Sequence, residues 1–144
     1  MKNIRSANIK NGKSSELEFA ALAMKLGFSV LQPLDESNPY DFVLVKNDKF
    51  IKVQVKSTHK ERVTSYPYKN RIVKTLAYTF NTSNAKHLGY TKKQIDFMIL
   101  HIAPIDTWYV IPADKAKSTC ISILKYGKNS KYTKFKNNFE LLEE

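Results

Sequence analysis

Hydrophobic positions first follow a helical period near the start of the chain. An Ala-, Leu- and Met-rich segment has Ser14 or Ser15 as its N-cap and Gly27 as its stop, which predicts a helix to about Leu26. Residues 1–13 are polar and are expected to be frayed. The predicted buried stripe of this helix consists of Leu17, Ala20, Ala21 and Met24.

After the helix, apolar residues alternate with polar ones or form short β-branched runs, which predicts strands. The expected strands are 28–32, the two halves of a hairpin at 40–57, 72–81, 95–103, 107–113 and 119–126. Short helical turns are expected at 113–117 and 139–144, a polar excursion at 61–71, and a solvent-facing segment at 127–138. This order predicts an α+β fold with a mixed sheet. Because no linker or repeat is visible, we expect one domain spanning 1–144.

The hairpin brings distant polar residues together. Its turn, residues 47–48, is Asn-Asp, which tolerates the positive backbone angles of a tight two-residue turn. That turn sets Lys46 opposite Lys49. In the same register Asp41 lies across from Gln54, on one face and with β-carbons about 5 Å apart.

Lys56 follows Gln54 by two residues and therefore shares its face. The other face carries the expected core residues Tyr40, Phe42, Leu44, Ile51, Val53 and Val55. Asp41 is a poor strand former, and its carboxylate with the Gln54 amide oxygen suits Mg²⁺, while a lysine beside the ion can orient a water or stabilise charge. The alternative is that these side chains form the solvated side of a half-exposed sheet.

Composition and charge narrow the class of protein. The 144 residues are 42% hydrophobic and 12% aromatic, typical of a folded domain, and no apolar run reaches the roughly 18 residues of a membrane span. The only cysteine, Cys120, excludes an internal disulfide, and the basic start lacks a secretory signal, so we expect a cytoplasmic location. The net charge of +11 favours a nucleic-acid partner, although lysine-rich coding bias is an alternative explanation.

The residues of the hairpin resemble a known signature. Pro-Tyr-Asp followed by Gln-Val-Lys is similar to the PD-(D/E)XK nuclease motif, and most similar to its group I intron-associated homing endonuclease branch. In that branch a Gly-x-x-x-Glu on the first helix and a further Gly precede the motif. The matching residues here are Gly12, Glu16, Gly27, Pro39, Tyr40, Asp41, Gln54, Val55 and Lys56. The resemblance implies a restriction-endonuclease-like core, with a mixed central β-sheet flanked by helices.

The resemblance also implies roles for individual residues. Asp41 would be the central metal ligand, with the Gln54 side-chain oxygen and the Val55 carbonyl as further ligands. Glu16 would contact a metal-bound water or a second ion, and Lys56 would be the catalytic lysine. Gln54 replaces the usual acidic residue, and the loss of a negative charge is expected to weaken metal affinity.

Glu18 is the alternative to Glu16 for the acidic residue of the first helix. Glu16 is favoured because it lies nearer the border of the predicted buried stripe and because the family spacing selects it. Among the histidines, His59 is expected to be a surface residue rather than a group that assists the leaving group. His87 and His101 lack partners at ligand spacing and are assigned no role.

The implied activity is that of a Mg²⁺-dependent endonuclease, with Mn²⁺ as a possible substitute, that hydrolyses phosphodiester bonds in duplex DNA in a homing or restriction-like setting. Arg62, Lys69 and Arg71 lie in a segment, 60–74, that we expect to contact DNA phosphates; a merely solvated loop is the alternative. Cutting both strands favours a homo-oligomer, a dimer or tetramer. The alternative functions are a catalytically inactive DNA-binding module of the same fold and a junction resolvase or repair nuclease.

Overall fold

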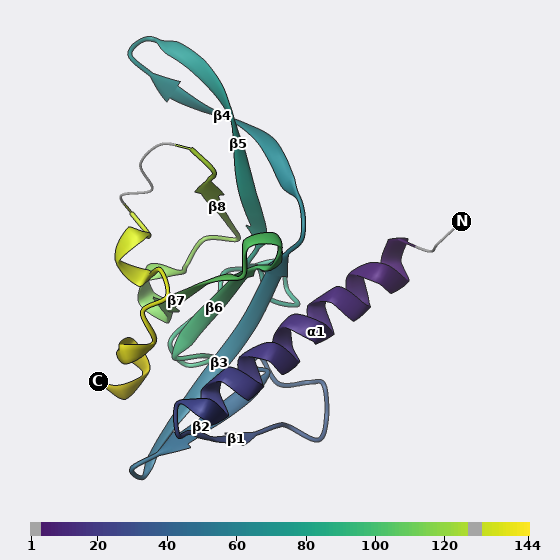
Figure 1. The fold of residues 1–144 in the computed structure, drawn as a ribbon, viewed down its shortest axis with the longest axis vertical. Coiled ribbons are helices and arrows are strands. Elements are labelled where there is room, and N and C mark those ends of the chain that lie inside the picture. Colours follow the sequence, from purple (N-terminus) through teal and green to yellow (C-terminus); the bar gives the residue numbers. More distant parts are fainter. Residues whose placement is uncertain (1–3, 127–130) are drawn as a thin grey trace.

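The computed structural model describes residues 4–126 and 131–144 (Figure 1). One long helix, α1, spans Ile4–Lys25. Among the described residues, eight strands follow it: β1 (Ser29–Leu31), β2 (Phe42–Lys46), β3 (Lys49–Thr58), β4 (Glu61–Tyr68), β5 (Arg71–Asn81), β6 (Phe97–Ile102), β7 (Thr107–Pro112) and β8 (Cys120–Leu124). The part of the chain that the structure describes also contains four short 3-10 helices: η1 (Ala103–Ile105), η2 (Ala113–Lys115), η3 (Thr133–Phe135) and η4 (Phe139–Glu143). The predicted α+β class is confirmed.

The central sheet is mixed. Its strand order is β1-β2-β3-β6-β7, in which β3 and β6 run parallel and the other neighbours are antiparallel. A second, antiparallel sheet has the order β4-β5-β8. Helix α1 crosses the central sheet over β3 (Figure 1). One core cluster lies between α1 and this sheet, and a second forms on the other face of β6 and β7, with β5 and β8.

Helix α1 begins earlier than the sequence pattern predicts. It starts at Ile4, so the described residues before Ser14 are helical rather than frayed, and residues 5–11 are exposed. This part of α1 extends past the sheet (Figure 1). Helix propagation is much easier than nucleation, so the packed second half extends into this polar segment.

The buried face of α1 also differs from the predicted stripe. Leu17 and Met24 are 56% and 57% exposed, and Ala21 is exposed as well. The buried residues are Ser15, Phe19, Ala20 and Ala23, of which only Ala20 was predicted. Small residues at this face bring the helix close to the sheet, and the Phe19 ring lies 5.8 Å from that of Trp108.

Gly27 ends α1 as predicted. Its φ of 91° lies in the left-handed region that favours glycine. The Gly27 N–H donates to the Met24 carbonyl and the Phe28 N–H donates to the Ala23 carbonyl, at 3.0 and 3.1 Å. This is the Schellman arrangement, and it turns the chain into β1.

The register of the β2–β3 hairpin is as predicted. Asn47 and Asp48 have φ of 51° and 60°, and Lys46 pairs with Lys49. The predicted core residues Phe42, Leu44, Ile51, Val53 and Val55 are all buried against α1. Tyr40 instead packs against the cluster on the opposite face, because it precedes β2 and does not follow the strand's alternation.

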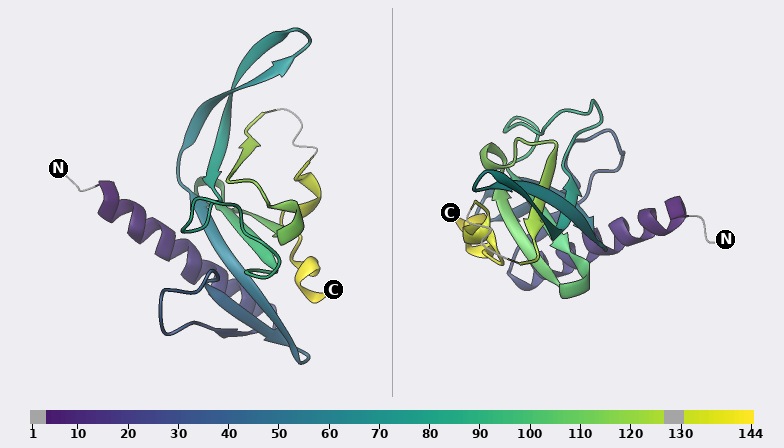
Figure 2. Two further views of the ribbon diagram at one scale, coloured as in Figure 1. Left: turned by 180° about the vertical axis from the view of Figure 1, so that it is seen from behind. Right: turned by 90° about the horizontal axis from the view of Figure 1, so that it is seen from above.

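The predicted polar excursion at 61–71 is wrong, because it forms β4 and a two-residue turn into β5. Lys69 and Asn70 occupy that turn with φ of 44° and 61°. Since β8 pairs only with Ala77–Asn81 of β5, the rest of the hairpin, residues 61–76, projects from the molecule (Figures 1 and 2). We call these residues the arm.

The lysine-rich segment 127–138 is not uniformly solvent-facing. Residues 127–130 lie outside the described part of the chain. Tyr132 and Phe135 are buried in the core cluster formed by β5, β6, β7 and β8, so the prediction of a solvent-facing segment is wrong for these two residues. Lysines flank these aromatic residues in the sequence, so the high local charge suggested exposure although the two rings pack into the core.

Candidate active site

Asp41 sits at the open end of the β2–β3 hairpin. Its backbone N–H donates to the Val53 carbonyl at 2.8 Å, although Val53 is the register partner of Phe42, so the chain departs from the hairpin register just before β2. Its Oδ2 accepts hydrogen bonds from Gln54 Nε2 and from the Val55 N–H, both at 2.8 Å. The structure therefore brings together the Asp41 carboxylate, the Gln54 amide and the Val55 backbone N–H.

The face that carries Gln54 is covered rather than solvated. Gln54 is only 8% exposed, and its β6 neighbour in the register is the buried Met98. Lys56 lies beside the buried Leu100 in the same way. The alternative of a solvated sheet face is therefore wrong for Gln54, and the Asp41 carboxylate borders on a region of low polarity.

This environment changes the acidity of Asp41. Burial raises the pKa of its carboxyl from 3.8 to about 6. The hydrogen bond from the Val55 N–H acts in the opposite direction and lowers this pKa. The charge of Glu16 raises this pKa further, while Lys56 and Lys13 lower it. The site thus places two carboxylates near each other beside two lysines.

Glu16 is directed to the cleft beside Asp41, whereas Glu18 is directed to His101. Glu16 lines a cleft of about 700 Å³ together with Asp41, Gly12 and Lys13. Lys13 Nζ lies 3.1 Å from the Glu16 carboxylate. Glu18 is directed to another cluster, described below, because two residues along a helix turn a side chain by about 200°. The geometry places Glu16, not Glu18, beside Asp41.

Tyr90 forms a wall of the site that the sequence did not indicate. Lys56 Nζ lies 5.8 Å from the centre of its ring. Burial raises the pKa of the Tyr90 hydroxyl, and the Asp41 charge adds to this effect. Tyr90 belongs to a loop between β5 and β6, and no spacing rule connects such a loop to the hairpin.

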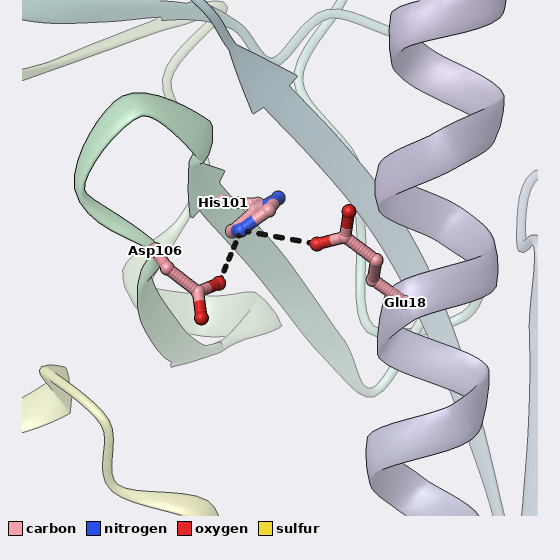
Figure 3. Close-up of side chains that lie close together, drawn as sticks. All are labelled: Glu18, His101 and Asp106. Carbon is pink, nitrogen blue, oxygen red and sulfur yellow. Dashed lines mark hydrogen bonds and ion pairs between the residues drawn. The ribbon is translucent and has the colours of Figure 1, made fainter.

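A second cluster lies at the C-terminal end of β6 (Figure 3). His101 is 2% exposed, and its Nε2 is 2.9 Å from Asp106 Oδ1 and 3.7 Å from Glu18 Oε2. Its Nδ1 is 2.8 Å from the Ser15 hydroxyl. The expectation that His101 lacks partners is therefore wrong. Helix α1 supplies Ser15 and Glu18, and the turn between η1 and β7 supplies Asp106, so linear spacing could not show the cluster.

The predicted DNA-contacting cations lie on the arm. Arg62 belongs to β4, Lys69 to the turn and Arg71 to the start of β5, and all three are exposed. His59, just past β3, is half-buried, and its Nε2 has no hydrogen-bond partner among the described residues. It therefore is not the plain surface histidine that we expected.

The raised pKa of Asp41 predicts a pH-dependent stability. Between pH 3.8 and about 6 the folded state holds a proton that the unfolded state has released, so the free energy of unfolding should fall as pH rises through this range. The two pH units correspond to at most about 3 kcal/mol. Urea unfolding at pH 4 and pH 7.5, without metal, measures this change.

Asp41→Asn is the control for that measurement, because asparagine has no proton to lose. Subtracting its pH profile from that of the unaltered protein removes the contribution of other carboxyl groups. We expect the difference to show the predicted fall. Two parallel profiles would contradict the raised pKa.

Comparison with known protein families gives one match that spans most of the chain. The profile of the PD-(D/E)XK endonuclease family matches residues 7–141. The chain therefore belongs to the PD-(D/E)XK endonuclease family, as its motif predicted. No curated protein sequence matches it closely enough to count as a relative.

A solved structure shares the fold. It is described as a bacterial homing endonuclease, I-Ssp6803I, and it is 21% identical to this chain with a TM-score of 0.66. The match covers 91% of this chain and 87% of that one. The predicted restriction-endonuclease-like fold is confirmed. Within the described residues, no helix combines the length and the apolar character needed to cross a membrane.

Proposed function

We propose that this chain is a Mg²⁺-dependent endonuclease that hydrolyses phosphodiester bonds in duplex DNA, in the cytoplasm and in a homing or restriction-like setting. The observation that carries this proposal is the carboxylate of Asp41, partly buried and held by Gln54 and Val55 beside Lys56 and Glu16. Family membership supports the endonuclease class. The duplex substrate and the ion are the parts that we infer.

The residues present suit a hard cation. Asp41 offers a carboxylate, Val55 a backbone carbonyl and Gln54 an amide oxygen, all of them the oxygen ligands that Mg²⁺ prefers. The Gln54 amide directs its Nε2 to Asp41 and to the Val55 carbonyl, at 2.8 and 3.3 Å. A half-turn of this amide presents Oε1 to the same space, so we propose that Gln54 turns when the ion binds.

The raised pKa of Asp41 should make cation binding dependent on pH. A cation requires the ionised carboxylate and therefore competes with the proton that burial favours. We expect the metal affinity to fall about tenfold per pH unit below the pKa of about 6. Activity should then require neutral or alkaline pH.

Lys56 and Glu16 have separate proposed roles around the ion. When bound, Mg²⁺ would make a water more acidic and offset charge on the phosphate. The Lys56 ammonium, against the Tyr90 ring, would orient that water or stabilise the added negative charge. Glu16, at the wall of the cleft and held by Lys13, would position a water or a second ion.

A substrate pool tests the proposal. Supercoiled plasmid, genomic DNA and a synthetic four-way junction are incubated with the protein in Mg²⁺, in Mn²⁺ and in EDTA. We expect metal-dependent cutting of linear or plasmid duplex and none in EDTA. Cutting confined to the junction would favour a resolvase, and cutting that persists in EDTA would contradict metal dependence.

One observation favours the second candidate, a DNA-binding module without activity. The family's usual acidic residue is replaced here by Gln54, whose amide faces Asp41 as a hydrogen-bond donor and so occupies the place of an ion. This reading predicts salt-sensitive DNA binding with no cleavage of any substrate in the pool. The same assay therefore distinguishes the two candidates.

We propose that the arm contacts DNA phosphates. A two-stranded hairpin exposed on both faces is only marginally stable alone, and this one carries Arg62, Lys69 and Arg71 on its surface. Lys69→Ala with Arg71→Ala should weaken DNA binding at 50 mM salt and lower the slope of log affinity against log salt by about 2. Fluorescence anisotropy over a salt series measures this slope.

Lys10→Ala with Lys25→Ala is the matched control for the arm. Both lysines are exposed on α1, outside the arm, and their loss removes the same charge. We expect the arm pair to lower the salt slope more than the control pair does. Equal effects would show that net charge, rather than the arm, determines binding.

We also propose that the protein acts as a homo-oligomer, a dimer or tetramer, because cutting both strands is simplest with two active sites. Leu17 and Met24 form an exposed apolar stripe on the outer face of α1. Such a stripe is a candidate for the contact between copies. Light scattering over a concentration series tests the assembly.

A further inference from the structure

We propose that Glu18, His101 and Asp106 form a second metal site, for a divalent transition-metal ion of the Zn²⁺ class. This site is separate from the one proposed at Asp41 and does not depend on the nuclease function. Each residue offers one ligand atom, and the three atoms lie within 4.8 Å of one another. One imidazole nitrogen with two carboxylate oxygens is a donor set that such ions accept, with solvent as the remaining ligand.

The distances between the ligand atoms suit a single ion. Around a tetrahedral ion with bonds of about 2.0 Å, neighbouring ligand atoms lie about 3.3 Å apart. Here His101 Nε2 is 2.9 Å from Asp106 Oδ1 and 3.7 Å from Glu18 Oε2. Both carboxylates belong to exposed residues, so small rotations of their side chains complete the geometry, and water can reach an open position.

The imidazole is held in place from its other side. Ser15, 1% exposed, lies 2.8 Å from Nδ1, and this hydrogen bond fixes the orientation of the ring. The Trp108 ring stacks on His101 with 3.7 Å between centroids and 9° between planes. Nε2 is therefore directed to the two carboxylates (Figure 3). Metal-binding histidines commonly have such support at their second nitrogen.

The position of the cluster gives the ion a structural consequence. Glu18 comes from α1, His101 from the end of β6, and Asp106 from the turn between η1 and β7. An ion between them would tie the helix to the edge of the sheet. It would also fix the rotation of α1 about its axis, and with it the position of Glu16 on the side of the helix facing Asp41.

A hydrogen-bonded cluster without an ion is the competing explanation, since His101 Nε2 lies within hydrogen-bond distance of Asp106 Oδ1. The two explanations differ in a measurable way, because Trp108 is the only tryptophan of the chain and stacks on the proposed ligand. The probe is Co²⁺, a paramagnetic quencher of tryptophan fluorescence that occupies Zn²⁺ sites. The titration is made in the Asp41→Asn protein at pH 7.5, so that the proposed catalytic site does not contribute.

We expect Co²⁺ to quench Trp108 fluorescence with one ion per chain, and an equal concentration of Zn²⁺ to restore it, since Zn²⁺ binds such ligands more tightly. Asp106→Asn and Glu18→Gln, each added to that protein, should weaken the apparent affinity at least about tenfold. Both side chains are exposed, and asparagine tolerates the left-handed backbone of Asp106, with its φ of 44°.

Asp48→Asn is the matched control, because Asp48 is also an exposed aspartate with positive φ, in the distant β2–β3 turn. It should leave the Co²⁺ affinity unchanged. Three results would overturn the proposal: no quenching at micromolar Co²⁺, quenching that Zn²⁺ does not reverse, or equal affinity in the Asp106→Asn and Asp48→Asn proteins. Each would leave the hydrogen-bonded cluster without an ion as the explanation.

Discussion

Asp41→Asn is expected to lower the rate of DNA cleavage at least about a thousandfold without loss of DNA binding. Asparagine keeps an oxygen that can accept the hydrogen bonds of Gln54 and the Val55 N–H, so the hairpin should remain intact. It removes the charged ligand that a cation requires. Single-turnover cleavage of the duplex found in the substrate pool, with binding measured in Ca²⁺, separates the two effects.

The same variant should be more stable than the unaltered protein at pH 8. Burial and the neighbouring Glu16 both disfavour the ionised Asp41 carboxylate, and asparagine carries no charge. Inactive variants are commonly more stable than the active protein where an active site holds like charges close together. Asp48→Asn, in the hairpin turn, is the control and should change neither property. Full cleavage by Asp41→Asn would contradict the assignment of the metal ligand.

Phe19→Ala is expected to lower the free energy of unfolding by about 3–5 kcal/mol. Phe19 is fully buried at the centre of the contact between α1 and the sheet, where its ring meets Trp108. Domains of this size are stable by only about 5–15 kcal/mol, so the variant should be close to unfolding. Urea unfolding followed by circular dichroism gives the value.

Leu17→Ala is the comparison, because Leu17 belongs to the predicted stripe but is exposed. We expect it to change stability by no more than about 0.5 kcal/mol in the monomer. If Leu17→Ala cost as much as Phe19→Ala, the helix would pack through the stripe that the sequence predicted and not through the one observed.

The helix face shows one limit of prediction from the sequence. The segment contains two apolar stripes, one through Leu17 and Met24 and one through Phe19 and Ala23. Their periods are the same, so periodicity cannot choose between them. The choice depends on the fit of small residues against the sheet, where Ser15 also meets His101.

The arm shows a second limit. A strand that buries one face alternates polar and apolar residues, but β4 is exposed along most of its length on both faces. Its pattern therefore does not differ from that of a loop. Pro67 also favours a loop, because proline is uncommon inside strands. Proline is tolerated here because β4 is an edge strand of its sheet.

The candidate site was predictable where it depends on local geometry. The tight turn at 47–48 determines the register as far as Phe42 and Val53, and Asp41, the next residue, then reaches Gln54 and Val55 with its carboxylate. Tyr90 and the α1 partners of His101, Ser15 and Glu18, reach their places through tertiary packing between distant segments. No local rule carries that information, so the sequence could not reveal them.

The central claim is that a metal ion binds at Asp41, and anomalous scattering from crystals grown with Mn²⁺ tests it most directly. Such a map locates the ion among the side chains without any knowledge of the DNA target. We expect a peak within bonding distance of Asp41, the Gln54 side-chain oxygen and the Val55 carbonyl, and its loss in Asp41→Asn. A map with no peak at Asp41, even if Mn²⁺ appears between Glu18, His101 and Asp106, would contradict the proposed active site.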